Sequence, residues 1–173
     1  MAKTAGGVRT YKQGSSTFRK RQAEIVAMRQ SGKYSSVEIG KGGGYVAVEN
    51  STARHKPEEL EAARILADKG YKVILKNEAG LGYKVKTPDG YLFSASFEQR
   101  TPQQGGAKSF CKSLEHAKHK QADIAVVYDK NRVYDRKEVE TGIARFEQYN
   151  RYRFKQVFVV SGSGSIHRHK HNT

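Results

Sequence analysis

The feature that most constrains the fold is the apolar run Ile124-Ala125-Val126-Val127-Tyr128. Its unbroken apolar character predicts a strand covered on both faces, and therefore a central strand of a sheet. Segments with helical periodicity flank it at residues 110–117 and 135–146. At 173 residues the chain is long enough for one domain with a real hydrophobic core. We therefore expect a sheet packed by helices.

The N-terminal part of the sequence predicts a basic arm, a helix and a hairpin. Residues 1–15 lack apolar periodicity and are expected to form a mobile basic arm. A helix is predicted from Ser16 or Thr17 to Gly32. Two alternating pieces around the glycine cluster at residues 40–44 predict a hairpin with a flexible loop. The cluster lacks the residue order of a phosphate-binding loop.

The middle of the chain predicts a helix followed by strands. Pro57 suits the first position of a helix, and Gly70 its C-terminal stop. A strand is expected at residues 71–75. The turn Thr87-Pro88-Asp89-Gly90 predicts that residues 83–86 and 91–98 form an antiparallel pair, with Glu98 opposite the aromatic face of its strand.

We therefore predict an α+β fold with a small, mostly antiparallel sheet packed by helices and a basic N-terminal helical arm. The expected division is an arm, helix and hairpin over residues 1–50, a nuclease-like α+β domain over 51–161, and a basic flexible tail over 162–173. The tail contains His167, His169 and His171, which could bind metal but are expected to be solvated.

The net charge of +15 indicates a polyanionic partner such as nucleic acid, with an anionic membrane surface as the weaker alternative. No apolar run has the length of a membrane span, and the first residues lack a signal-peptide core, so we expect no membrane partner and a cytoplasmic or virion-associated location. The single cysteine, Cys111, excludes an intramolecular disulfide and a cysteine-based zinc site.

Five residues are the candidates for a catalytic site. Cleavage of a phosphodiester needs a proton acceptor, a proton donor and cations that stabilise the phosphoryl oxygens. His55 would be a general acid or base and Glu98 its partner, while Arg100, Lys56 and Thr101 would hold the phosphate. Taken singly, His55 could equally be an exposed residue before a helix, and Glu98 and Arg100 ordinary charges at the end of a strand. The residues expected to bind nucleic acid are Lys56, Arg19, Lys20, Arg21, Lys112 and Lys118.

A metal-dependent site is the second interpretation. Glu61, Asp89 and Glu98 could form a carboxylate cluster for a divalent cation. A basic residue two positions after Glu98 would complete the pattern, but Arg100 is effectively always protonated and cannot serve as a base. The metal-free mechanism is therefore the leading prediction, and no cofactor is expected.

Residues 55–160 carry a family resemblance, in the segments E-E-L-E-A-A-R-I-L-A-D-K-G-Y-K-V, T-P-D-G-Y-L, S-F-E-Q-R-T and A-K-H-K-Q-A-D-I-A-V-V. This pattern resembles the phage-encoded and toxin nuclease domains of the barnase, EndoU, colicin and RelE-like superfamily. Such domains occur in phage head-morphogenesis proteins and in contact-dependent growth-inhibition toxins. The resemblance implies an α+β RNase fold, metal-free cleavage of RNA, and an immunity or phage structural protein as partner.

A similar layout occurs in toxin tRNases with a PD-(D/E)xK-like core. This sequence departs from that core at Arg100, where the core has lysine, and at the glycine after Asp89. We therefore expect an RNA-binding protein that cleaves RNA. The alternatives are a non-catalytic nucleic-acid-binding or virion-associated protein, a metal-dependent nuclease of the PD-(D/E)xK type, and an interaction module for an acidic protein partner.

Overall fold

The computed structural model describes residues 9–50, 54–77 and 87–170. The chain divides into two compact units, an N-terminal unit, Ala5–Ser94, and a C-terminal unit, Ala95–Thr173. None of the helices in the described ranges is long and apolar enough to cross a membrane.

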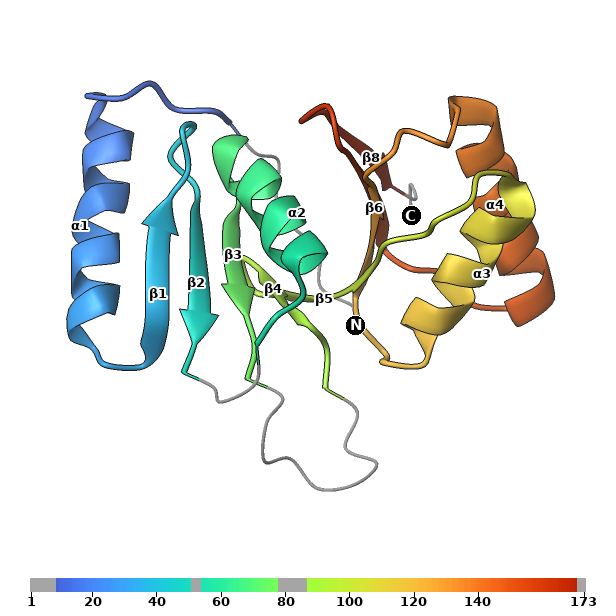
Figure 1. Cartoon of the computed structure of the whole chain (residues 1–173), viewed down its shortest axis with the longest axis horizontal. Coiled ribbons are helices and arrows are strands. Elements are labelled where there is room, and N and C mark those ends of the chain that lie inside the picture. Colours follow the sequence, from blue (N-terminus) through green and yellow to red (C-terminus); the bar gives the residue numbers. More distant parts are fainter. Residues whose placement is uncertain (1–8, 51–53, 78–86, 171–173) are drawn as a thin grey trace. The chain divides into compact units, whose positions relative to one another are not determined.

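In its described residues, the N-terminal unit combines two helices with four strands, which can be followed in Figure 1. The strands lie in the order β1-β2-β3-β4, and the pairings are antiparallel, parallel and antiparallel in turn. The predicted first helix, hairpin and Pro57 helix are confirmed. The elements are α1 (Ser16–Gln30), β1 (Tyr34–Ile39), β2 (Tyr45–Glu49), α2 (Pro57–Asp68), β3 (Lys72–Leu75) and β4 (Gly90–Leu92).

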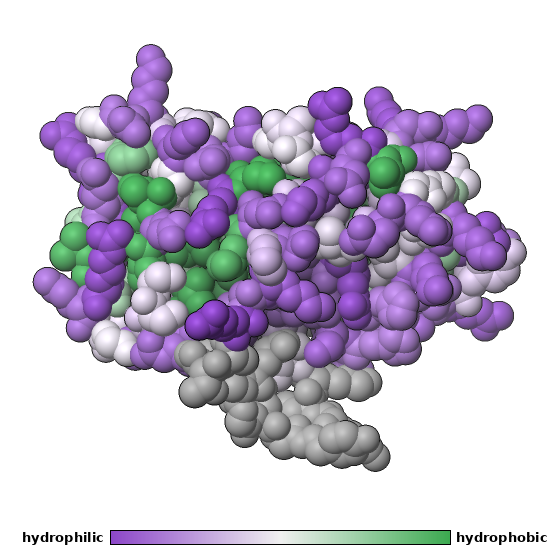
Figure 2. Space-filling model, in the orientation of Figure 1, coloured by the Kyte–Doolittle hydropathy of each residue, from purple (hydrophilic) through white to green (hydrophobic). Residues whose placement is uncertain are grey.

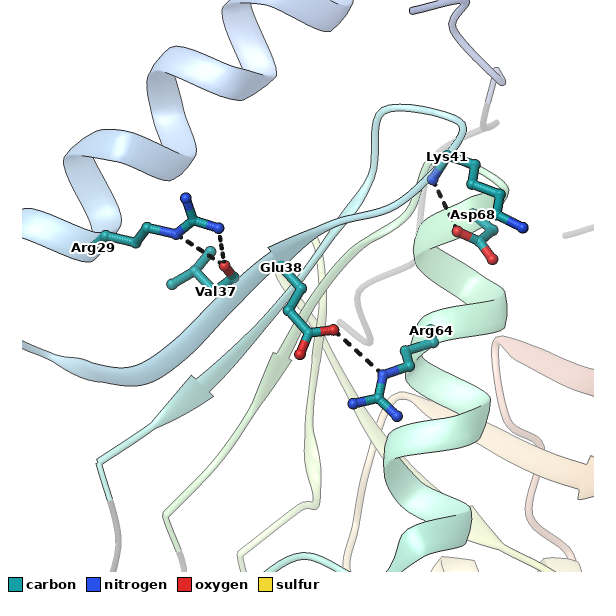
Figure 3. A network of polar contacts seen from close by, with 6 residues as sticks. All are labelled: Arg29, Val37, Glu38, Lys41, Arg64 and Asp68. Atoms are coloured by element: carbon teal, nitrogen blue, oxygen red, sulfur yellow. Dashed lines mark hydrogen bonds and ion pairs between the residues drawn. The ribbon is translucent and has the colours of Figure 1, made fainter.

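Helix α1 is part of the packed unit and not a separate arm. Its Ile25 is buried with Val37 and Ala47 of the hairpin. The guanidinium of Arg29 donates to the carbonyl oxygen of Val37 over 2.7 and 3.1 Å (Figure 3). Before the helix, the Tyr11 N–H donates to the Gly42 carbonyl oxygen at 2.8 Å. The described part of the expected arm therefore makes a backbone contact with the glycine cluster, which the sequence did not predict.

The glycine cluster at residues 40–44 packs tightly against the C-terminal end of α2. A Cβ atom on Gly40 or Gly44 would collide with backbone atoms at that end of the helix. The Gly44 N–H donates to the Ala67 carbonyl oxygen at 3.2 Å, and the Lys41 N–H donates to Asp68 Oδ1 at 2.8 Å (Figure 3). The cluster thus allows a close backbone approach to α2, which the prediction of a hairpin loop did not include.

The strand expected over residues 91–98 is interrupted. Strand β4 ends at Leu92, Phe93 takes a left-handed conformation with φ of 54°, and β5 begins at Ala95. Strand β4 pairs with β3. Its expected partner, residues 83–86, lies outside the described residues.

Over residues 95–170, the C-terminal unit has two helices and four strands, which can be followed in Figure 1. Strands β5, β6 and β7 run parallel, and β8 is antiparallel to β7. All six residues of β6 are buried between two neighbouring strands, which confirms the predicted central strand. The elements are β5 (Ala95–Arg100), α3 (Ala107–Lys118), β6 (Ile124–Asp129), α4 (Arg136–Asn150), β7 (Gln156–Ser161) and β8 (Ile166–Lys170).

The predicted mostly antiparallel sheet is wrong. The pairings β2–β3, β5–β6 and β6–β7 are parallel, so the strands form mixed sheet within each unit. The physical reason lies in the connections, because α2, α3 and α4 each link two neighbouring strands and a helical crossover returns the chain in the same direction. The predicted flexible tail also differs, since its residues 166–170 form β8.

The core of the C-terminal unit lies between α3, α4 and one face of its sheet. Phe110, Leu114 and Phe146 pack there against β6 and β7. Helix α4 begins with the predicted capping box, in which the Glu138 N–H donates to Asp135 Oδ1 at 2.7 Å and the Asp135 N–H donates to Glu138 Oε2 at 3.0 Å. This box fixes the start of α4 at the carboxyl ends of the parallel strands.

Candidate functional site

Strand β5 carries Glu98 and Arg100 on the face that α3 and α4 cover. Glu98 pairs with Ala125 and Arg100 with Val127, and residues paired across neighbouring strands point to the same face. Ala125 and Val127 belong to the helix-covered core of the C-terminal unit. Both predicted site residues therefore point toward the helices near the carboxyl end of β5.

Glu98 and Arg100 form a partly covered ion pair. Arg100 Nη2 lies 3.9 Å from Glu98 Oε1, and the side chains are 40% and 4% exposed, respectively. The buried Arg100 Nε has no hydrogen-bond partner among the described residues. The guanidinium can therefore present its outer nitrogens to a solvent anion, while the buried carboxylate lies beneath it. Of the two groups, Arg100 is the one that an incoming phosphate can reach.

The loop after β5 leads directly from this pair to the N-terminus of α3. Thr101 begins the loop, and Gly106 is the N-cap residue of the helix, with φ of 95° and no side-chain cap. The first turn of α3 contains no acidic residue. A helix start of this kind presents backbone N–H groups and the positive end of the helix dipole to an anion. Arg100 and this helix start are therefore both suited to phosphate.

Tyr134 fixes the same loop from the side. Its hydroxyl donates to the Gln104 carbonyl oxygen at 2.8 Å and lies 2.8 Å from Ser109 Oγ on α3. Burial raises the pKa of the Tyr134 hydroxyl, so the group stays protonated and remains a donor. Gly105 packs against the backbone of Val133. The loop at residues 101–106 is thus tied to the segment that leads into α4.

His55 and Lys56 belong to the N-terminal unit. His55 Nδ1 lies 2.9 Å from Glu59 Oε2, which also accepts a hydrogen bond from the Lys56 N–H at 3.2 Å. Burial alone would raise the pKa of the Glu59 carboxyl, but the hydrogen bond and charge of His55, with the Lys56 N–H, hold that pKa below its ordinary value of 4.5. A carboxylate that orients an imidazole suits a general acid or base and equally a helix start.

The structure brings Glu98 together with Arg100 and places Thr101 directly after them. Grouping these residues with His55 and Lys56 stays a prediction. Of the alternative metal set, Glu61 lies on α2 and the Asp89 carbonyl oxygen accepts from the Lys76 N–H at 2.9 Å, both in the N-terminal unit. Across the described ranges, no group of three His, Cys, Asp or Glu residues is arranged to hold a metal ion.

The residues predicted to contact nucleic acid divide into exposed and partly covered cations. Arg19, Lys20, Lys56 and Lys112 are exposed. Arg21 lies over the ring of Tyr11, and Lys118 over the ring of Tyr152. Figure 2 shows mainly hydrophilic side chains on one face of the molecule, with apolar atoms gathered over β1 and β2. Exposed cations are thus available on both units.

The C-terminal unit also contains a pocket of about 250 Å³ that the sequence did not predict. It lies where β6 and β7 end, between the first turns of α4 and strand β8. The signal in the sequence was the spacing His167-x-His169, which places both imidazoles on one face of a strand. The residues that line it are Asp129, Arg132, Tyr134, Asp135, Arg136, Val139, Glu140, Val159, Ser161, Ser165, His167 and His169.

No protein-family model matches the chain, and no curated protein matches it. Among solved structures, it is similar to a chain of the CdiA-CT/CdiI toxin and immunity complex from Burkholderia pseudomallei, with 22% sequence identity and a TM-score of 0.51. The match covers 71% of this chain and 98% of that chain. The likeness is one of fold alone.

Proposed function

We propose that this protein is a toxin-type RNase that binds RNA through its basic surface and cleaves it without a metal ion. The observation that carries the proposal is the Glu98–Arg100 pair, which the loop at residues 101–106 links to an uncapped helix start, in a chain with a net charge of +15. The fold shared with a chain of a toxin and immunity complex supports the toxin class. An immunity protein is accordingly the proposed protein partner, and the cytoplasm or a virion the proposed location.

The proposed chemistry assigns the phosphate to Arg100 and Thr101. Donors aimed at the phosphoryl oxygens stabilise the charge that develops as the ribose 2′-oxygen attacks phosphorus and the 5′-oxygen leaves. Glu98, which is only 3% exposed, holds the guanidinium and, when substrate opens the pair, takes the proton of the attacking 2′-hydroxyl. His55, oriented by Glu59, is the proposed acid that gives a proton to the leaving 5′-oxygen.

The test is incubation of the purified protein with total tRNA and with duplex DNA, with and without EDTA. We expect RNA cleavage that survives EDTA and falls at least about 100-fold in Arg100→Ala and in Glu98→Gln, since removing one such group costs about that much. His55→Ala is the separate test of the second acid or base. Lys137→Ala removes an exposed charge from α4 and serves as the matched control.

Each alternative predicts a different outcome of the same experiment. Cleavage that EDTA abolishes would refute the metal-free mechanism and favour a metal-dependent one. Salt-sensitive RNA binding without any product would identify a non-catalytic nucleic-acid-binding protein. Absence of RNA binding at low salt would refute both the enzyme and the nucleic-acid interpretation.

A further inference from the structure

The pocket of the C-terminal unit lies at the edge where parallel strands characteristically bind ligands. Strands β6 and β7 run parallel and end at Asp129 and Ser161, and both residues line the pocket. In sheets with parallel strands and helical crossovers, ligands bind outside the carboxyl ends of the strands. The position of the pocket therefore suits a binding site, and its volume of about 250 Å³ suits a ligand slightly smaller than a typical drug.

The three carboxylates of the pocket are already engaged within the protein. Asp129 is buried and accepts hydrogen bonds from the N–H groups of Val133 and Tyr134, at 2.8 and 3.1 Å. Asp135 caps α4, and Glu140 lies 2.9 Å from Arg136. These negative charges are therefore directed at the protein's own donors and not at a ligand.

The remaining polar groups are mainly donors. Arg132 extends from the loop after β6, and its guanidinium makes no ion pair or hydrogen bond within the part of the chain that the structure describes. His167 points into the same pocket from β8, and Ser165 adds a hydroxyl. A guanidinium and an imidazole on one side of a pocket suit an anionic group such as phosphate.

The floor of the pocket is apolar. Val139 of α4 and Val159 of β7 are 7% and 9% exposed, and both line the pocket. The ring of Tyr134 stands at its side, packed edge-on against Phe110 at a centroid distance of 5.2 Å. A ligand that fills this space therefore combines a flat, largely apolar part with an anionic group, as a nucleotide does.

The pocket and the Glu98–Arg100 pair lie on one face of the C-terminal sheet. Arg100, Val127, Val159 and His167 are paired in a row across β5, β6, β7 and β8. Neighbouring strands lie about 4.8 Å apart, so Arg100 and the pocket floor at Val159 are separated by about 10 Å in the sheet. A single strand whose phosphate contacts Arg100 could extend to the pocket.

We propose that this pocket binds one nucleotide of an RNA strand, with the base against Val139 and Val159 and the phosphate at Arg132 and His167. The choice of a nucleotide among anionic ligands rests on the proposed RNA binding. The pocket would thus be a subsite, separate from the Glu98–Arg100 pair, that selects which part of an RNA is held by the C-terminal unit.

The test is an NMR titration of the full-length, isotope-labelled protein with each of the four ribonucleoside 5′-monophosphates. We expect saturable shifts of the backbone amides at residues 161–169. Inorganic phosphate and the unphosphorylated nucleosides should each bind at least tenfold more weakly, because neither engages both parts of the pocket. Equal binding of inorganic phosphate, or no saturable shift with any nucleotide, would overturn the proposal.

Two variants in the pocket and one control variant outside it test whether the nucleotide binds in this pocket. Arg132→Ala should weaken nucleotide binding at least tenfold, and Ser165→Tyr, which fills the pocket from an exposed position, should abolish it. Lys137→Ala removes an equal charge from α4 outside the pocket and should change the affinity less than twofold. Wild-type affinity in both pocket variants, with their spectra showing folded protein, would place the nucleotide elsewhere and refute the subsite.

Measuring RNA cleavage and nucleotide binding on the same purified proteins tests the RNase activity and the nucleotide subsite separately. Nucleotide binding at the pocket by a protein that binds RNA without cleaving it would leave the subsite standing and refute the RNase. Cleavage that depends on Arg100, without nucleotide binding at the pocket, would refute the subsite and leave the RNase standing.

Discussion

Replacing Asp129 with alanine should destabilise the C-terminal unit strongly and locally. The carboxylate is 4% exposed and accepts the N–H groups of Val133 and Tyr134. A buried donor left without an acceptor costs about 1–3 kcal/mol. Both residues are half-buried, so water satisfies part of the loss. We therefore expect Asp129→Ala to lower the free energy of unfolding by about 2–4 kcal/mol, and Asp129→Asn, which keeps one acceptor oxygen, by about half of that.

The assay is urea unfolding followed by circular dichroism, together with amide hydrogen exchange. In the wild type the Val133 and Tyr134 amides should be protected, and in Asp129→Ala they should exchange much faster. Asp135→Asn is the matched control, because asparagine caps a helix about as well as aspartate. Loss of less than about 0.5 kcal/mol in Asp129→Ala, or unchanged protection of the two amides, would refute the assigned hydrogen bonds.

Three further predictions concern stability. Glu59→Gln should lower the free energy of unfolding by about 1 kcal/mol near neutral pH. Because the pKa of Glu59 is lowered in the folded state, the stabilisation by its carboxylate is complete above pH 4.5 and is lost as the pH falls below that value. A difference between the two proteins in urea unfolding that does not change with pH would contradict the His55 contact. Gly44→Ala should cost about 2–4 kcal/mol in the same assay, since its Cβ would meet backbone carbonyls at the end of α2, and a smaller effect would contradict the close approach. Phe146→Ala should lower the free energy of unfolding by about 3–5 kcal/mol. Tyr149, on the same helix, is 69% exposed, and Tyr149→Ala should change that free energy by no more than about 0.5 kcal/mol. Equal effects of the two substitutions would refute the assigned core.

The helices could be predicted from the sequence because their signals are local. Pro57 and the pair Asp135 and Glu138 mark helix starts through contacts within one turn, and both starts lie where expected. Glu98 and Arg100 could likewise be grouped, because residues two apart share one face of a strand. Local geometry was enough for these features.

Strand direction was predicted wrongly because it depends on connections between distant segments. The alternation of strands and helices from residue 95 to residue 161 favours parallel pairing. The prediction of a mostly antiparallel sheet rested instead on the turn at residues 87–90, which bears on one pair of strands only. Strand β8 was missed for a related reason. His167, Arg168 and His169 carry no apolar alternation, and their strand exists through backbone pairing with β7. Without β8 the pocket that it closes could not be predicted.

The parallel crossovers of the C-terminal unit have a consequence for how its specificity could be altered. The segments that leave β5, β6 and β7 all begin at one edge, whereas the core beneath them is built from the helices and the strand interiors. Residues 101–106 and 130–135 are tied together by Tyr134, so these two segments would have to be exchanged as one unit, and residues 162–165 as another. Grafting such loops from one chain of this fold to another should transfer ligand preference without redesigning the interior.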